Sequence, residues 1–174
     1  MALRIIAGEA RGRRLSTPEG MDVRPSTGRV REAVFNSLHS LGCLEGAEVL
    51  DLFAGTGALG LEAVSRGAAS ATFVESAPSA LAALRANIDL TGFNDRCRVV
   101  PGAVMEELPR LDGDYDVALC DPPYRFTAWP ELLLRLPADT VVAESDQAVV
   151  PGLGWDVIKQ QRYAGTVVVI ASRQ

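Results

Sequence analysis

Strand-like and helix-like segments alternate across the middle of this chain, and that alternation limits the fold more than any other feature. Short apolar runs predict buried strands at 48–52, 71–74, 96–100, 114–120 and 140–143. Helical periodicity predicts helices between them at 57–66, 79–90, 104–108 and 129–136. Repeated strand–helix units build a parallel sheet with helices on both faces, because each crossover returns the chain to the same edge. We therefore predict an α/β protein.

Both ends of the chain break the alternation. Near the C-terminal end, strands at 155–162 and 166–171 flank a short turn that contains Gly165. This pattern is typical of a hairpin, which would add an antiparallel strand to the sheet. Near the N-terminal end, 4–7 and 13–16 predict the two short strands of a small hairpin.

An amphipathic helix connects the N-terminal hairpin to the first strand of the sheet. Ser26 or Thr27 can cap the start of this helix, and Gly42 ends it. We expect two parts, a basic hairpin extension at 1–22 and a single domain at 23–174, because one hydrophobic core can support a chain of this length.

The composition excludes several classes of protein. Of the 174 residues 48% are hydrophobic, and no apolar run approaches the roughly 18 residues of a membrane span. The first residues are too weakly apolar for a signal peptide, so we expect a cytoplasmic protein. We also expect it to be a monomer. Cys43, Cys97 and Cys120 fit neither a disulfide framework nor a zinc site. His39 is the single histidine of the sequence, which excludes a histidine metal cluster and argues against a serine–histidine triad. No metal is expected.

The charge is distributed unevenly along the chain. The net charge is −5, yet residues 1–35 contain seven arginines and four acidic residues. A basic arm on an acidic body is what a local docking surface for RNA would look like. The alternative is a solvated hairpin in an arginine-rich protein, since Lys159 is the single lysine of the sequence. The candidate RNA contacts are Arg4, Arg11, Arg13, Arg14, Arg29 and Arg31.

A glycine-rich loop follows the strand predicted at 48–52. Gly55, Gly57 and Gly60 have the G-x-G-x-x-G spacing of a loop that a ligand can approach closely. Asp51 precedes the loop, where its charge would oppose a pyrophosphate but suit a cation, and Glu75 ends the next strand, where it can accept both hydroxyls of a ribose. These residues suit a cofactor that has a ribose and a positive charge but no phosphate. S-adenosylmethionine fits that description better than NAD does. The alternative is that the glycines only pack the helix on the sheet.

The tetrapeptide Asp121-Pro122-Pro123-Tyr124 follows the strand predicted at 114–120. Proline fixes φ and restricts the preceding residue, so the Asp121 side chain and the Pro122 carbonyl are held in one geometry. Two acceptors beside an aromatic ring suit a planar group with an exocyclic amine, such as a nucleobase. The alternative is that the tetrapeptide only ends the strand and begins a loop. We favour a ligand-binding role for the tetrapeptide, because Asp51, Glu75 and Asp121 all fall at carboxyl ends of predicted strands. Open α/β sheets bind ligands at that edge.

Together these motifs resemble the class I S-adenosylmethionine-dependent methyltransferases, and more narrowly the RsmD family, which methylates the N2 amine of a guanine in 16S ribosomal RNA. The resemblance covers nearly the whole chain and includes 24–27, 29–32, 35–36, 50–63, 65–68, Glu75, Asn87, 121–124 and 144–145. It implies a Rossmann-like fold with a mostly parallel seven-stranded sheet, an antiparallel final hairpin and helices on both faces.

The resemblance also implies a cofactor site. Asp51, Gly55 and Gly57 would hold the methionine part of S-adenosylmethionine, and Glu75 its ribose. The implied cofactor contacts are Arg24, Thr27, Asp51, Phe53, Ala54, Gly55, Gly57, Glu75, Ser76, Gly102 and Ala103. Two positions depart from the family, which often has an acid at Gly28 and an Asp or Asn at Ala103. The Ala103 side chain cannot bond the adenine amine.

The expected reaction is methylation of guanine N2 in 16S RNA within an assembled or partly assembled small subunit. Asp121 and the Pro122 carbonyl would accept the two amine hydrogens and stabilise the developing positive charge in a pocket closed to water. Tyr124 would stack on a flipped base, so that the predicted catalytic group is Asp121, Pro122, Pro123 and Tyr124. Three alternatives stay open: an adenine N6 methyltransferase of RNA or DNA, a NAD-linked oxidoreductase, and a non-catalytic relative that binds S-adenosylmethionine or RNA.

Overall fold

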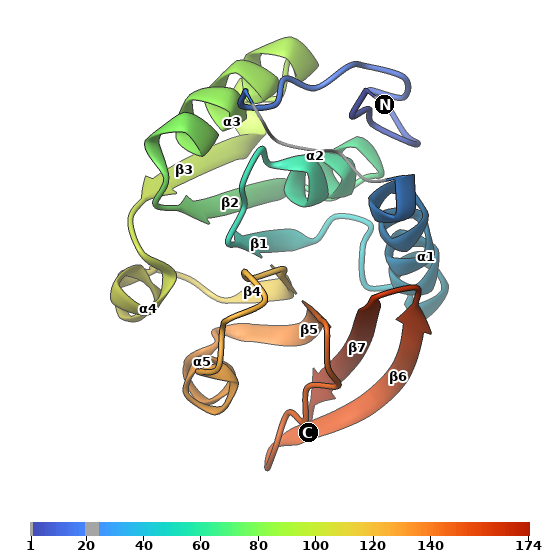
Figure 1. Cartoon of the computed structure of the whole chain (residues 1–174), viewed down its shortest axis with the longest axis vertical. Coiled ribbons are helices and arrows are strands. Elements are labelled where there is room, and N and C mark those ends of the chain that lie inside the picture. The colour runs from blue at the N-terminus through green and yellow to red at the C-terminus, as the bar shows by residue number, and fades with distance from the viewer. Residues whose placement is uncertain (1, 20–24) are drawn as a thin grey trace.

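A computed structural model describes residues 2–19 and 25–174 of the chain. In chain order, with η marking 3-10 helices, the elements are α1 (Pro25–Leu41), β1 (Glu48–Leu52), α2 (Ala58–Ser65), β2 (Ser70–Glu75), α3 (Pro78–Thr91), η1 (Asn94–Arg96), β3 (Cys97–Pro101), α4 (Val104–Glu107), η2 (Leu108–Arg110), β4 (Tyr115–Cys120), α5 (Trp129–Arg135), β5 (Ala138–Ser145), β6 (Trp155–Tyr163) and β7 (Thr166–Arg173). Figure 1 shows these strands in one twisted sheet that has helices on both sides.

The seven strands of the sheet lie in the order β3-β2-β1-β4-β5-β7-β6. Strands β1 to β5 pair in parallel, whereas β7 lies antiparallel between β5 and β6. The predicted fold class, with its antiparallel final hairpin, is therefore confirmed. The strand order changes direction between β1 and β4, and open α/β sheets bind ligands at such a switch point, beyond the carboxyl ends of the strands.

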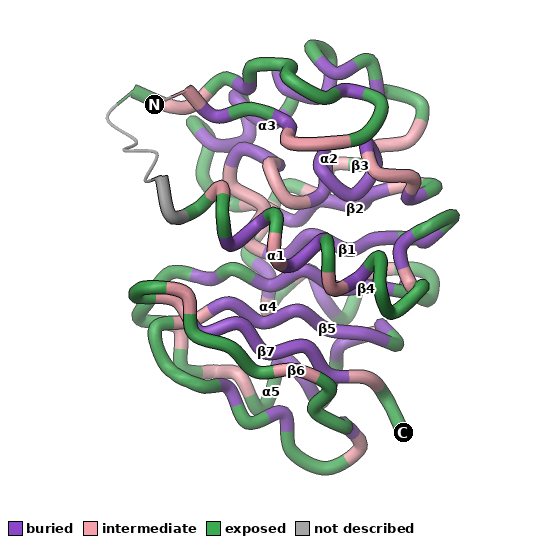
Figure 2. Tube along the Cα trace, turned by 90° about the vertical axis from the view of Figure 1, so that its right-hand side faces the viewer, coloured by how far each residue is buried: buried purple, intermediate pink, exposed green. Residues whose placement is uncertain are grey.

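Two hydrophobic clusters cover the two faces of the sheet. The first contains side chains of α1, α2, α3 and the N-terminal segment, and the second contains side chains of α4, η2 and α5. Neighbouring strand residues alternate between them, so that Val49 of β1 belongs to the first cluster and Leu50 to the second. Burial on both faces explains why the strand sequences are continuous apolar runs. The edge strand β6 is mostly exposed (Figure 2).

The N-terminal segment is fastened to α2 and α3 by buried polar side chains. Glu62 accepts hydrogen bonds from the backbone N–H groups of Ile6 (2.8 Å) and Ala7 (3.0 Å). The Asn87 side chain accepts from Ser16 N–H (2.6 Å) and donates to the Ser16 carbonyl (3.0 Å). The segment also contributes Leu3, Ile5, Ala10 and Leu15 to the first cluster. The N-terminal segment is thus part of the main core. The predicted domain boundary between residues 22 and 23 stays a prediction.

The N-terminal hairpin is less regular than its sequence pattern predicted. An isolated antiparallel bridge joins Arg4 and Arg14, and neither 4–7 nor 13–16 forms a strand. The reason is that the backbone donors at 6 and 7 bond the Glu62 carboxylate and cannot extend a ladder.

The helix α1 also begins earlier than predicted. It starts at Pro25, so Ser26 and Thr27 lie inside the helix rather than before it. Proline suits a first helical position because its fixed φ matches the helix and its missing N–H has no partner there in any case. Gly42, at φ 70°, follows the last helical residue as predicted.

Candidate functional site

Three strand ends bring the predicted carboxylates together. In the register of the sheet, Asp51 of β1 lies opposite Leu119 of β4, and Asp121 follows two residues later. Since side chains alternate between faces, Asp121 continues on the α1–α3 face to which Leu119 and Asp51 belong. Glu75 ends β2, the strand on the other side of β1. The structure therefore places Asp51, Glu75 and Asp121 at one edge, as the sequence predicted.

The glycines of the loop have two different roles. A Cβ on Gly57 would lie 2.4 Å from Leu84, and one on Gly60 would lie 2.4 Å from the Phe73 ring, so both glycines let α2 pack closely on its neighbours. Gly55, at φ 56°, has nothing within 4 Å of such a Cβ among the described residues. The packing interpretation thus holds for Gly57 and Gly60, whereas Gly55 presents open backbone.

Asp51 is buried beneath the start of α2. Its carboxylate accepts the N–H of Gly60 at 2.8 Å, near the positive end of the helix. Burial raises the pKa of Asp51 well above its ordinary value, the Gly60 hydrogen bond lowers it, and the charges of Asp121 and Glu75 raise it further. A carboxyl group in this state is stabilised by any cation that approaches the loop.

Glu75 is oriented by three backbone amides. One carboxylate oxygen accepts the N–H of Gly55 at 2.8 Å, and the other accepts those of Ser76 (2.8 Å) and Ala77 (2.7 Å). These contacts hold the glycine loop against the end of β2. Because each carboxylate oxygen has two lone pairs, Glu75 keeps acceptor capacity for a diol while its orientation is fixed.

The residues predicted beside the adenine lie at the ends of β2 and β3. Ser76 and Ala103 are exposed, and the N–H of Gly102 donates to the Glu75 carbonyl at 2.9 Å. Ala103 precedes α4 and accepts hydrogen bonds from Glu106 (3.0 Å) and Glu107 (2.9 Å) through its carbonyl. Its methyl side chain offers no polar group there.

The Asp121–Tyr124 loop is rigid at its base and open at its tip. Pro122 is buried, and a turn closes behind it through the N–H of Phe126 bonded to the Pro123 carbonyl at 2.9 Å. Asp121 is exposed, and Tyr124 is 55% exposed. The tip of the loop is therefore exposed, and closure of the pocket to water stays a prediction, since Arg24, one of the implied cofactor contacts, lies outside the described residues.

An aromatic ladder connects this loop to the glycine loop. The Phe53 ring lies 5.1 Å from that of Phe126, which in turn lies 5.3 Å from Trp129, both edge-to-face. Phe53 also has φ 61°, a conformation that costs free energy in any residue except glycine. The ladder fixes the spacing between the two motifs. Phe126 and Trp129 were missed from the sequence because isolated aromatic residues there carry no pattern.

Comparison with known proteins decides the family. A sequence profile described as "Conserved hypothetical protein 95" matches residues 3–169. The chain belongs to this family. It is 42% identical over 123 residues to the Ribosomal RNA small subunit methyltransferase D of Escherichia coli K12, an alignment that covers 71% of this chain but only 61% of that protein. The protein of the same name from Haemophilus influenzae is 30% identical over 171 residues, which cover 91% of this chain and 88% of that protein.

Solved structures agree with the family assignment. The yhhF protein of Escherichia coli superimposes with a TM-score of 0.87 at 32% identity, covering 100% of this chain and 99% of that one. Protein HI0767 of Haemophilus influenzae gives 0.79 at 26% identity and covers 99% of both chains. The resemblance to the RsmD family is thereby confirmed, and with it the Rossmann-like class I methyltransferase fold.

One predicted RNA contact of this family member is wrong. Arg31 is 4% exposed, and its Nε lies 3.6 Å from the Glu62 carboxylate. Its guanidinium also donates to the Arg4 carbonyl at 2.6 Å. Arg31 therefore holds α1 against α2 and the N-terminal segment, and it cannot reach a phosphate. A count of arginines along the sequence cannot reveal that this one points inward.

The other predicted basic contacts lie on the surface. Arg4 donates to the Gly12 carbonyl at 2.9 Å and Arg13 to the Leu90 carbonyl, both from exposed positions. Arg11, Arg14 and Arg29 are exposed as well, and so is Thr27, one of the implied cofactor contacts. Arg24 lies outside the described residues.

Glu144 belongs to segment 144–145, which carries part of the family resemblance, and the sequence motifs do not place it in the site. It lies near the end of β5 and is 7% exposed. Burial, followed by the charges of Asp121 and Asp51, raises its pKa to about 8, against the opposing effect of Arg31. Its position one strand away from Asp121 became visible only with the strand register.

This raised pKa predicts a pH-dependent stability. The folded chain keeps a proton on Glu144 between about pH 4.5 and 8, which the unfolded chain releases, so the free energy of unfolding falls as pH rises through this window. Each pKa unit corresponds to roughly 1.4 kcal/mol. We expect Glu144→Gln to remove a penalty on the order of 5 kcal/mol at pH 9 and little at pH 4.5. Urea unfolding across this range measures it, and a pH-independent difference between the two proteins would contradict the assignment.

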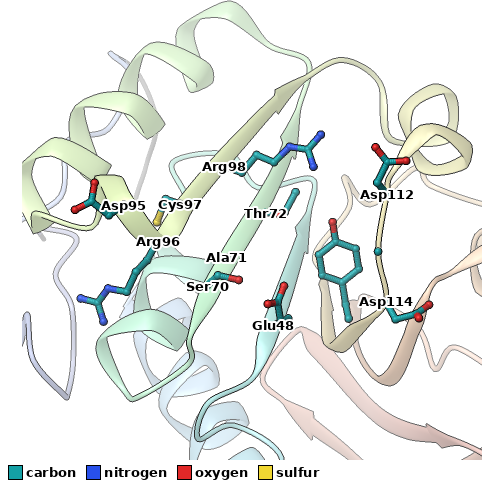
Figure 3. Close-up of a pocket in the computed structure, with 12 residues that line it drawn as sticks. Glu48, Ser70, Ala71, Thr72, Asp95, Arg96, Cys97, Arg98, Asp112 and Asp114 are labelled. Atoms are coloured by element: carbon teal, nitrogen blue, oxygen red, sulfur yellow. The ribbon is translucent and has the colours of Figure 1, made fainter.

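A separate pocket lies at the opposite edge of the sheet (Figure 3). It has a volume of about 290 Å³ and lies at the starts of β1 to β4, with Glu48, Arg98, Asp112 and Tyr115 in its wall. Its charges are mixed in sign, and it contains none of the predicted site residues.

Within 2–19 and 25–174, no group of three or more His, Cys, Asp or Glu side chains could hold a metal ion. Among the helices of the same ranges, none has both the length and the apolar character needed to cross a bilayer.

Proposed function

We propose that this chain transfers a methyl group from S-adenosylmethionine to the exocyclic N2 amine of a guanine in 16S ribosomal RNA. The observation that carries the proposal is the position of Asp121 at the end of β4, one strand from the glycine loop and on the same face as Asp51. The relatives named Ribosomal RNA small subunit methyltransferase D support the RNA substrate.

The residues at the ends of β1, β2 and β3 fit a cofactor of this kind. S-adenosylmethionine, when bound, supplies a methyl group on a positively charged sulfur. The carboxylates of Asp51 and Asp121 favour positive charge at this edge, and the open backbone at Gly55 permits close approach. Glu75 has its orientation fixed for a ribose diol. With alanine at 103, the adenine is held by backbone groups or by Ser76.

Asp121 and the Pro122 carbonyl would hold the amine. Both are acceptors, and the amine gains positive charge as the new bond forms, so their hydrogen bonds strengthen toward the transition state. No strong base is required, because the amine proton becomes acidic at that moment. Tyr124, exposed beside them, would stack on the flipped guanine with a contribution of roughly 1–3 kcal/mol. RNA docked over this edge would help to exclude water from the exposed tip of the loop.

The surface arginines of the N-terminal segment would bind RNA phosphates. Arg11 and Arg14 are exposed on the segment that Glu62 and Asn87 fasten to the core. We expect Arg11→Ala with Arg14→Ala to flatten the slope of log affinity against log salt by about 1 per arginine. Filter binding to small subunits at several salt concentrations measures the slope. Arg135→Ala, on the α5 face, is the control, and an unchanged slope in the double variant would contradict the docking surface.

Transfer of a labelled methyl group tests the proposed function. The substrates are small subunits that lack the modification, partly assembled subunits, and naked 16S RNA. We expect label in the assembled or partly assembled particles, since a net charge of −5 gives little attraction to free RNA. The chain is proposed to work as a monomer in the cytoplasm. The absence of label in all three substrates, with the cofactor bound, would contradict the proposal and favour a non-catalytic binding protein.

A further inference from the structure

The ring of Phe126 lies between the glycine loop and helix α5. Its centroid is 5.1 Å from that of Phe53, which follows β1, and 5.3 Å from that of Trp129, the first residue of α5. All three rings are half-buried and pack against the hydrophobic cluster to which α5 contributes. Phe126 therefore joins the loop that contains Asp121–Tyr124 to the segment that borders the expected cofactor site.

The backbone of this loop turns sharply just before Phe126. The N–H of Phe126 donates to the Pro123 carbonyl at 2.9 Å, which closes a tight turn with Tyr124 at its exposed tip. Among the described residues, no hydrogen bond between backbone groups joins 122–127 to another segment. Two side chains attach the ends of the turn to the rest of the chain: Pro122, which is buried, and Phe126, through its ring contacts.

The backbone conformation of Phe53 supports a role for its contact with Phe126. With φ at 61°, Phe53 adopts the left-handed conformation, which costs free energy in a residue with a large side chain. Glycine would avoid this cost, as Gly55 does two positions later at φ 56°. A glycine at position 53 would, however, leave the Phe126 ring without its partner. The contact between the two rings therefore gives a physical reason for a strained aromatic residue at this position.

This ring contact spans the gap between the two motifs of the site. Phe53 lies two residues before Gly55 of the glycine loop. Phe126 lies two residues after Tyr124, so the contact of 5.1 Å sets where the Tyr124 turn lies relative to that loop. A base stacked on Tyr124 must present its amine in line with the methyl group, and a displacement of about 1 Å can cost about 100-fold in rate.

We propose that Phe126 is a positioning residue, which fixes the turn at 123–126 on Phe53 so that Tyr124 holds the target base in line with the methyl donor. This inference rests on the function proposed above. Phe126 acts through Tyr124 and does not itself contact the base. Packing of the core alone would instead make Phe126 matter for stability and leave the rate of the folded protein unchanged.

A double-mutant cycle separates positioning from packing. We expect Phe126→Ala to lower the single-turnover rate of methyl transfer to unmodified small subunits by about 10- to 100-fold, and by no more than Tyr124→Ala does. Because Phe126 acts through Tyr124, adding Phe126→Ala to Tyr124→Ala should lower the rate by less than about 2-fold further. A larger further loss would show that Phe126 acts by another route and would overturn the inference.

Conservative and matched variants exclude a general loss of structure. Phe126→Tyr keeps the ring and should transfer methyl groups near the wild-type rate, whereas Phe126→Leu should lie between Phe126→Ala and wild type. Should Phe126→Ala fail to fold, Phe126→Leu takes its place in the cycle. Phe93→Leu is the matched control, because this ring is 1% exposed and lies near the start of β3, at the opposite edge of the sheet.

The Phe93 control has a defined result. Phe93→Leu should lower the urea midpoint at least as much as Phe126→Leu, because its ring is more deeply buried, and should leave the rate within about 2-fold of wild type. If Phe93→Leu slowed methyl transfer as much as Phe126→Leu does, lost stability would explain both variants and the inference would be wrong.

The inference and the proposed function fail in different ways. If the wild type methylates small subunits but Phe126→Ala or Tyr124→Ala keeps the full rate, the inference is wrong while methyl transfer stands. If the wild type transfers no methyl group, the proposed function itself fails. Calorimetry with S-adenosylhomocysteine should give Phe126→Ala an affinity close to wild type, since Glu75 holds the Gly55 N–H independently of Phe126. A loss of affinity as large as the loss of rate would place the defect in the cofactor site and overturn the inference.

Discussion

Replacing Asp121 by alanine should reduce methyl transfer by about 100- to 1000-fold, the usual loss when one preorganised polar contact to a transition state is removed. The contact is preorganised because Asp121 leaves the buried strand β4 directly into Pro122, which restricts its backbone. The loss should fall on the chemical step, since the amine gains charge only there. Single-turnover transfer to unmodified small subunits measures it.

Two controls make the Asp121 result specific. Affinity for S-adenosylhomocysteine, measured by calorimetry, should change far less than the rate, because Glu75 and the glycine loop are intact. Asp121→Asn keeps one acceptor oxygen and should lie between alanine and wild type. An alanine variant that transfers methyl groups at the wild-type rate would contradict the role of this carboxylate.

Replacing Glu62 by alanine should cost about 3–5 kcal/mol of folding free energy, the range found when one partner of a buried ion pair is removed. Glu62 is fully buried and serves four partners: the N–H groups of Ile6 and Ala7, Arg66 at 2.7 Å and Arg31 at 3.6 Å. Its loss leaves the buried Arg31 uncompensated and releases the N-terminal segment.

Denaturant unfolding of Glu62→Ala tests this network. Glu131→Ala removes a surface pair with Arg135 of similar length (3.1 Å) and should change stability by less than about 0.5 kcal/mol. Glu62→Gln should be intermediate, because it can still accept from the backbone. A Glu62→Ala variant as stable as the surface control would show that the segment is held mainly by its apolar side chains.

The sheet could be predicted because its physical causes are local. Strands buried on both faces must be apolar runs, and β1 begins and ends where its run does. β5 extends beyond its predicted range to Ala138–Ser145, because pairing with β4 and β7 recruits flanking residues that the pattern alone leaves out.

The site was only partly predictable, because its remaining features depend on contacts between distant residues. The positions of Asp51, Glu75 and Asp121 follow from strand ends, which a sequence displays. Arg31 points inward because it pairs with Glu62, which lies 31 positions later and on another helix. The exposure of Asp121 depends on all the segments that meet at the carboxyl edge of the sheet. Likewise, Glu144 joins the site through the register of β4 and β5, which no local pattern encodes.

The most direct test of the account is the identity of the methylated nucleoside. Small subunits treated with the protein and labelled S-adenosylmethionine are digested to nucleosides and separated with mass detection. We predict N2-methylguanosine as the labelled product, present with wild type and nearly absent with Asp121→Ala. Label in N6-methyladenosine, or equal yields of N2-methylguanosine from both proteins, would contradict it.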